Sequence, residues 1–160
     1  MDQIKKEKNS FGFPSSKKMS LPENYGYVFG AFGFSFFMNT FLIVQVVNAR
    51  KLYNVNYPLL YAPDTNEKAE KFNSVQRAHQ NTLESYPIVM VGMFACGLKH
   101  PITSAVCGMI YSVGRIIYGY GYAKYGPQSR MIGGIISHIG DFPLLLFIPL
   151  KIAYDSLTKY

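Results

Sequence analysis

Apolar residues along this chain gather into long stretches, and three of these stretches are long enough to cross a membrane as helices. A helix needs about 20 mostly apolar residues to span the hydrocarbon core of a bilayer. Each stretch reaches that length and contains at most one Asp, Glu, Lys or Arg, so the pattern predicts three membrane-spanning helices. The stretches are Tyr25 to Val47, Ile102 to Tyr122 and Met131 to Leu150.

A fourth helix is predicted where a polar segment runs directly into apolar sequence. The apolar run from Ile88 to Leu98 is too short to cross a bilayer by itself, because a spanning helix needs about 20 residues. The helix must therefore begin near Phe72 and pass through FNSVQRAHQNTLESYP, residues 72–87. The predicted span is Phe72 to Leu98, and the fold class is an all-α integral membrane protein with a four-transmembrane-helix bundle.

The polar residues of this fourth span fall on one side of the helix. At about 100° per residue, an arc of about 100° holds a cation, two amides and a carboxylate. These residues are Arg77, Gln80, Asn81 and Glu84. Ionisable groups at membrane depth are costly and usually face a bundle interior or a wet cavity. We therefore expect a site here for a small zwitterionic ligand.

Composition agrees with a single membrane domain. The chain has 160 residues, of which 49% are hydrophobic and 16% charged, against about 25% charged in typical soluble domains. We predict a polar, basic N-terminal extension over residues 1–23 and a membrane domain over residues 24–160. The extension is either a disordered tail or an arm that binds a partner or lipid headgroups. Basic residues occur in loops on both sides of the membrane, so they do not set the orientation.

Neither nucleic acid nor metal is an expected ligand. The net charge of +7 is spread over the extension, loops and helices, whereas a nucleic-acid surface gathers its Lys and Arg on one face. Anionic lipid headgroups account for the charge. The two cysteines, Cys96 and Cys107, have no metal-site spacing, and His79, His100 and His138 are far apart along the chain.

The third apolar stretch repeats the pattern of a polar face within a membrane helix. Spacings of four, three and four residues place Tyr111, Arg115, Tyr118 and Tyr122 on one side. Tyr118 and Tyr122 could instead belong to an interfacial aromatic belt. An Arg in the middle of a span needs a partner. For Arg115 that partner is either Glu84 on the neighbouring helix or a bound ligand.

Several cations are predicted to gather near one membrane face. Arg50 ends the first helix, and Arg130 follows Gly126-Pro127 at the start of the last one. Each alone is typical of a residue that extends to the lipid headgroups. Together with Arg77 they could lower the pKa of a thiol and stabilise its thiolate, the reactive form of sulfur.

The segment FNSVQRAHQNTLESYP resembles the signature of the MAPEG family, the membrane-associated proteins in eicosanoid and glutathione metabolism. The form RAHQNTLE followed by YP is most similar to type 3 microsomal glutathione transferases. ARKLYNVNYPLLYA and GRIIYGYGYAKYGPQSR are similar to that subgroup too, so the resemblance covers about residues 24–135. It implies a four-helix bundle that assembles as a homotrimer, with glutathione bound between neighbouring subunits and an apolar co-substrate arriving from the lipid.

The resemblance also implies roles for individual residues. Glu84 would bind the glutathione amine, Arg50 and Arg77 its carboxylates, and Arg130 would activate the thiol. The thiolate would attack a lipophilic electrophile or reduce a lipid hydroperoxide, with glutathione as co-substrate and no metal. The residues that match glutathione contacts are Arg50, Arg77, His79, Asn81, Glu84, Arg115, Tyr118 and Tyr122.

Two departures from the family pattern stand out. The leukotriene-C synthase branch has a Tyr directly after the Glu, whereas this chain has Ser85 at that position. Type 3 enzymes also lack that Tyr. The last helix contains His138, Asp141 and Pro143 where the relatives are mostly apolar. Pro143 should kink this helix. Asp141 needs a partner, either inside the subunit or in a protein that the ordinary trimer lacks.

Two other functions remain open. The chain could be an accessory subunit of a larger membrane assembly, such as a mitochondrial respiratory complex, that kept the fold. It could also be a non-catalytic lipid-binding module of the same family. For a transferase/peroxidase the endoplasmic reticulum is the expected membrane, with a mitochondrial membrane as the alternative.

Overall fold

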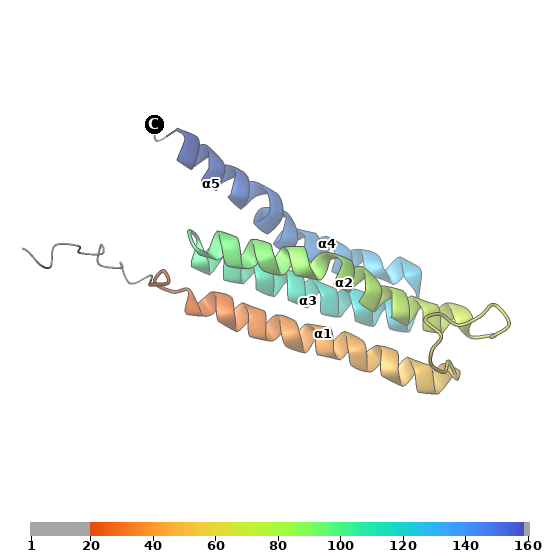
Figure 1. The fold of residues 1–160 in the computed structure, drawn as a ribbon. Helices are drawn as coiled ribbons and strands as arrows, with labels where there is room; N and C mark the ends of the chain where they lie inside the picture. Colours follow the sequence, from red (N-terminus) through yellow and green to blue (C-terminus); the bar gives the residue numbers. More distant parts are fainter. Residues whose placement is uncertain (1–19, 159–160) are drawn as a thin grey trace, which may run out of the picture.

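The computed structural model describes residues 20–158, and this part of the chain is helical without a strand. Three long helices, α1 (Gly26–Tyr53), α2 (Ala69–Gly97) and α3 (Pro101–Tyr125), lie side by side and alternate in direction (Figure 1). A fourth segment packs along α3. Most of the predicted extension, residues 1–19, lies outside the described residues, as do residues 159–160.

The predicted helices are confirmed, although their ends differ from the apolar stretches. α1 continues to Tyr53, beyond the apolar stretch that ends at Val47 and beyond the predicted helix end at Arg50, because a helix extends past the hydrocarbon core wherever polar residues accept helical geometry. It ends at Asn54, which has φ 55°, a left-handed conformation that Asn adopts more readily than most residues. Pro101 begins α3, a favoured place for a residue without an N–H.

Within residues 20–158, three segments are long and apolar enough to cross a membrane: Gly26–Tyr53, Pro101–Tyr125 and Pro127–Leu157. α2 has 29 residues, a length of about 44 Å at 1.5 Å per residue. That length suffices for a bilayer. The polar first half of α2, however, lowers its mean hydropathy below that of the three segments. The fourth crossing therefore stays a prediction.

The predicted kink at Pro143 is confirmed. The last segment begins with a short 3₁₀ turn, η1 (Pro127–Ser129), continues as α4 (Arg130–Phe142), passes through a π-helical turn, η2 (Pro143–Phe147), and ends as α5 (Ile148–Leu157). Proline lacks an N–H and crowds the preceding turn, and π-turns are a common way to accommodate such a break. α5 consequently leaves the bundle (Figure 1).

Small residues bring α3 and α4 into close contact. A Cβ atom at Gly133 would lie 2.1 Å from the Tyr118 nitrogen, and one at Gly114 would lie 2.4 Å from the Ser137 nitrogen. Without strong hydrophobic attraction between helices in lipid, close packing of small residues holds membrane helices together. This packing sets the position of Arg130, the first residue of α4, relative to the end of α3.

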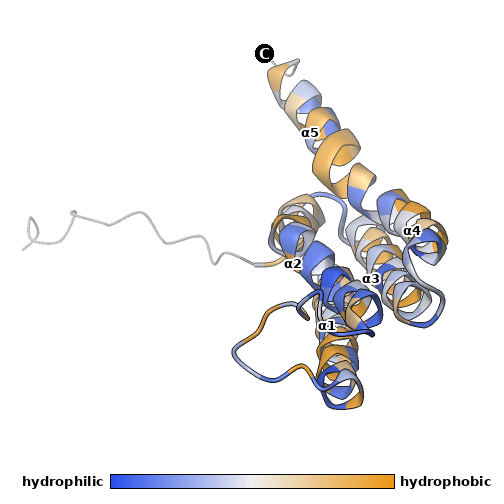
Figure 2. Ribbon diagram, turned by 90° about the vertical axis from the view of Figure 1, so that its right-hand side faces the viewer, coloured by the Kyte–Doolittle hydropathy of each residue, from blue (hydrophilic) through white to orange (hydrophobic). Residues whose placement is uncertain are grey.

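The polarity of the bundle is that expected in a membrane. Large apolar side chains such as Phe36, Phe37 and Ile132 are exposed, and much of the α5 ribbon has the colour of apolar residues (Figure 2). Hydroxyl groups are buried instead; Ser112 and Ser137 each donate a hydrogen bond to the carbonyl one turn earlier. An apolar exterior around self-satisfied polar groups is stable in lipid.

Candidate functional site

Most of the residues implicated by the sequence meet where α2 packs against α3. We call this region the seam and define it as Asn81, Ser85, Tyr111, Arg115, Tyr118, Tyr122 and Arg130. The seam forms because α2 and α3 are connected by only three residues, Leu98 to His100, and therefore run antiparallel as neighbours. α3 turns its polar face towards α2, and α2 contributes Asn81 and Ser85 to the contact.

Tyr118 and Tyr122 are packed inside the seam. Each is only 7% exposed, and their rings meet edge to face with centroids 5.7 Å apart. Asn81 Nδ2 donates a hydrogen bond to the Tyr118 hydroxyl over 2.9 Å. The two tyrosines therefore line the α2–α3 contact, and the interfacial-belt interpretation is wrong for them.

Arg130 extends the seam to the beginning of α4. Its guanidinium carbon lies 5.6 Å from the centre of the Tyr122 ring, within range of a cation–π interaction. The rest of the Arg130 side chain is exposed. The structure thus joins Arg130 to Tyr122 and, through Tyr118, to Asn81.

Arg115 lies at the centre of the seam, near the middle of α3, with 7% of its surface exposed. Its Nη2 donates to Ser85 Oγ over 2.8 Å, and that hydroxyl is 2.9 Å from the Tyr111 hydroxyl. Among residues 20–158 no ion pair joins Arg115 to Glu84, so the internal pairing that the sequence left open is not formed. Its Nε is buried and lacks a hydrogen-bond partner.

Arg77 and Glu84 lie on the outer face of α2, and both side chains are exposed. Arg77 Nη1 is 3.5 Å from the hydroxyl of Tyr61, a residue of the α1–α2 loop. Tyr61 also hydrogen-bonds Gln80 Oε1. The helix predicted through these polar residues is confirmed, and Arg77 and Glu84 on its outer face are not covered by the rest of the described chain.

Two implicated residues make other contacts. Arg50 Nη1 donates to the carbonyls of Val55 and Leu59 over 3.3 and 2.8 Å, and its guanidinium lies 4.4 Å from the Tyr57 ring centre. His79 Nε2 lies 3.3 Å from Asn39 Oδ1 of α1. Arg50 therefore holds the α1–α2 loop and His79 links α2 to α1, and neither has a hydrogen bond to a seam residue.

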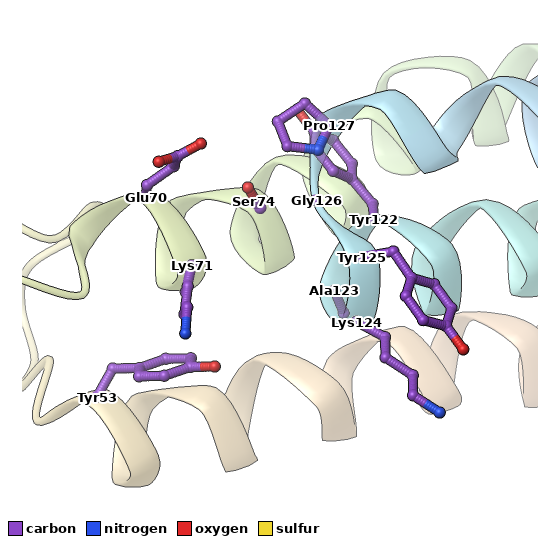
Figure 3. Close-up of a pocket in the computed structure, with 10 residues that line it drawn as sticks. All are labelled: Tyr53, Glu70, Lys71, Ser74, Tyr122, Ala123, Lys124, Tyr125, Gly126 and Pro127. Carbon is purple, nitrogen blue, oxygen red and sulfur yellow. The ribbon is translucent and has the colours of Figure 1, made fainter.

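A polar cavity of about 330 Å³ lies at the loop end of the bundle, beside the seam (Figure 3). Of the implicated residues only Tyr122 lines it, together with Tyr53, Ser74 and others. Lys71 points towards the Tyr53 ring, whereas Lys124 points away. Lys124 instead donates to the Tyr120 hydroxyl over 2.9 Å.

The sequence did not identify Tyr61 or the contacts of Ser85. Tyr61 belongs to a loop, and no periodicity indicates where a loop side chain will lie. The sequence marked Ser85 only as a departure from the family pattern. Its position next to Glu84 is the one signal that it lies near the candidate site. Within the described range, no three His, Cys, Asp or Glu side chains form a group that could hold a metal ion.

Comparison with known proteins places this geometry in context. The profile of the MAPEG family matches residues 28–148. The chain is 30% identical to human microsomal glutathione S-transferase 2 over 123 residues, which cover 76% of this chain and 78% of that one.

Two further relatives are more distant or match over a shorter range. The chain is 28% identical to bovine leukotriene C4 synthase over 92 residues, 57% of each chain, so it spans a little over half the length of that relative. It is 27% identical to the uncharacterized protein sll1147 of Synechocystis over 115 residues, which cover 71% of this chain and 79% of that protein.

Proposed function

Because this chain belongs to the MAPEG family, we propose that it is a membrane glutathione transferase with peroxidase activity, most similar to the type 3 subgroup. The observation that carries the proposal is the joining of Asn81, Tyr118, Tyr122 and Arg130 in one seam, beside the exposed Arg77 and Glu84. The relatives named glutathione S-transferase and leukotriene C4 synthase support glutathione as the substrate.

The open half of the site supports a trimer of four-helix subunits. Glu84 precedes Ser85, which bonds Arg115 near the middle of α3, so the exposed carboxylate lies deep in the predicted span. A charge at that depth is costly in contact with lipid. We infer that a neighbouring subunit covers the outer face of α2 and that glutathione binds between the two.

The proposed roles follow from the chemistry of glutathione, which has an amine, two carboxylates and a thiol. Glu84 binds the amine and Arg77 a carboxylate, while Asn81, Tyr118 and Tyr122 shape the seam side. Arg115 lines the site at greater depth, and His79 is a further ligand contact on the α1 side of α2. Arg50 binds a carboxylate of glutathione. It either reaches the ligand held by the adjoining subunit or first gives up its hydrogen bonds to the loop carbonyls.

Arg130 stabilises the glutathione thiolate. In conjugation the sulfur forms a bond to an electrophilic carbon of a lipophilic co-substrate, and the leaving group departs with the bonding electrons. In peroxide reduction the thiolate takes one oxygen of a lipid hydroperoxide, the O–O bond breaks and an alcohol forms after protonation. The resulting sulfenic acid condenses with a second glutathione to give the disulfide and water.

An accessory role in a larger membrane complex is the second candidate, and helix α4 favours it. His138 Nδ1 lies 3.1 Å from Asp141 Oδ2, and the imidazole side chain is 54% exposed while the carboxylate side chain is 7% exposed. This pair confirms that Asp141 has a partner within the subunit. An imidazole exposed on a spanning helix suits contact with another protein. For this accessory role we propose a mitochondrial membrane, and for the transferase the endoplasmic reticulum. A non-catalytic lipid-binding role is the third.

The test is activity of the purified protein in detergent, measured with glutathione and either a lipophilic electrophile or a lipid hydroperoxide. We expect Arg130→Ala to lower kcat by about 100-fold, the effect typical of removing one group that stabilises a developing anion. Lys99→Ala, at the opposite end of the bundle, should leave kcat unchanged. An inactive but well-folded wild type would reject the transferase and direct attention to the complex.

A further inference from the structure

We propose that Gln80 is a further glutathione contact and that the loop residue Tyr61 orients it; this inference rests on the function proposed above. Tyr61 lies between two side chains of the outer face of α2. Its hydroxyl donates to Gln80 Oε1 and lies 3.5 Å from Arg77 Nη1 as an acceptor. A phenol hydroxyl has one hydrogen to donate and lone pairs to accept, so both interactions coexist.

The loop holds Tyr61 in place from both sides. The neighbouring Ala62 is fixed to α2, since its N–H donates to Asn73 Oδ1 over 2.8 Å and its carbonyl accepts from Asn73 Nδ2 over 3.4 Å. On the other side, Arg50 donates to the carbonyl of Leu59 over 2.8 Å. Tyr61 is therefore positioned before any ligand arrives, and preorganisation reduces the cost of binding.

This contact decides which end of the Gln80 amide faces the site. The oxygen is occupied by the Tyr61 hydroxyl, so the nitrogen, with two N–H donors, is directed away from the loop. Within residues 20–158 the Gln80 nitrogen donates to no protein acceptor, while its side chain is half-buried. Gln80 lies three residues after Arg77 and four before Glu84, and residues at those spacings are neighbours on a helix.

Glutathione requires a donor of this kind. The carboxylates of the tripeptide suit Arg77 and its amine suits Glu84, but its amide carbonyls need a neutral N–H donor. Gln80 supplies one between the two charged residues. Tyr61 acts through Gln80 and Arg77 and is a positioning residue.

The test is calorimetric titration of the full-length protein in detergent with glutathione sulfonate, an unreactive analogue, alongside thermal unfolding. We expect Tyr61→Phe and Gln80→Leu each to raise Kd about five-fold, as for the loss of one hydrogen bond. The double variant should bind no more weakly than Gln80→Leu alone, because Tyr61 acts on the ligand chiefly through Gln80. The matched control is Tyr120→Phe, which removes a phenol hydroxyl on α3 and not in the α1–α2 loop. This variant should not change Kd.

A second variant separates binding from loop attachment. Gln80→Glu keeps an acceptor for the Tyr61 hydroxyl but removes the amide donors, so it should preserve the unfolding temperature and still weaken binding by at least five-fold. If Tyr61→Phe and Gln80→Glu change only the unfolding temperature, the pair merely holds the loop and the inference is wrong. If the wild type does not bind the analogue, the proposed function fails with it.

Discussion

Asn81 and Glu84 are one turn apart on α2 but lie in opposite surroundings. Asn81 belongs to the seam, where its amide bonds the buried Tyr118 hydroxyl within the same subunit. Glu84 belongs to the outer face, where its side chain is exposed although the helix lies deep in the predicted membrane. Under the proposed function, a single chain preforms the half of the site around Asn81, whereas the half around Glu84 is completed by a ligand or a neighbouring copy.

The largest expected effect comes from separating α4 from the seam. A Cβ at Gly133 would lie 2.1 Å from the Tyr118 nitrogen, whereas one at Gly134 would lie 3.8 Å from the nearest atom, Tyr118 Cδ2. Gly133→Ala must therefore displace the α3 backbone, at a cost of about 1–3 kcal/mol.

Adjacent glycines make this prediction well controlled. Gly134→Ala adds the same methyl group in ordinary contact and should be neutral or slightly stabilising, since Ala favours a helix over Gly. Thermal unfolding in detergent compares the two variants. Equal unfolding temperatures would show that the α3–α4 packing does not support the seam.

A smaller effect tests the comparison between Asn81 and Glu84 directly. Asn81→Ala removes the donor to Tyr118 and should lower the free energy of unfolding by about 1 kcal/mol. Glu84→Gln should leave unfolding unchanged because no ion pair involves Glu84 in the described part of the chain. It should weaken glutathione binding, which titration measures.

The opposite pattern would reverse the assignment of the two regions. If Glu84→Gln lowers stability as much as Asn81→Ala, Glu84 has a structural partner in the assembled protein. In that case the outer face would be an assembly contact and not part of the ligand site.

Hydropathy and helical periodicity predicted the helices and the polar face of α2, because both depend on residues close in sequence. They missed the end of α1, since NARKLY is polar but helical. The kink after α4 followed from Pro143, although the π-helical form of the turn did not. The continuation of the last helix to Leu157 lay beyond the apolar stretch that defined the prediction.

The candidate site was harder to predict because it depends on how helices rotate against each other. Spacing placed Arg115 on a polar face and offered Glu84 or a bound ligand as its partner, but it gave no indication of the hydrogen bond to Ser85. Arg50 was assigned from resemblance, whereas in this subunit it binds loop carbonyls. Tyr61 lies in a loop, and only the folded chain brings it to Arg77 and Gln80.

The smallest expected change in stability concerns Arg115, the buried cation of the seam. Its hydrogen bond to Ser85 stabilises it, but no carboxylate of the described chain pairs with it, and its Nε has no partner. Replacing a buried charge that lacks a carboxylate partner with an apolar side chain of similar length is often neutral or stabilising. We therefore expect Arg115→Met to change the free energy of unfolding by less than about 1 kcal/mol.

If Arg115 adds little to stability, its role lies in ligand binding. Arg115→Met should weaken glutathione binding about ten-fold or more, since a charged donor at low dielectric binds an anionic ligand strongly. Arg115→Lys keeps the charge but loses the fork of donors, so its affinity for glutathione should lie between those of the wild type and Arg115→Met. Strong destabilisation by Arg115→Met with unchanged binding would make Arg115 a structural residue, and the ligand site would then be confined to the outer face of α2.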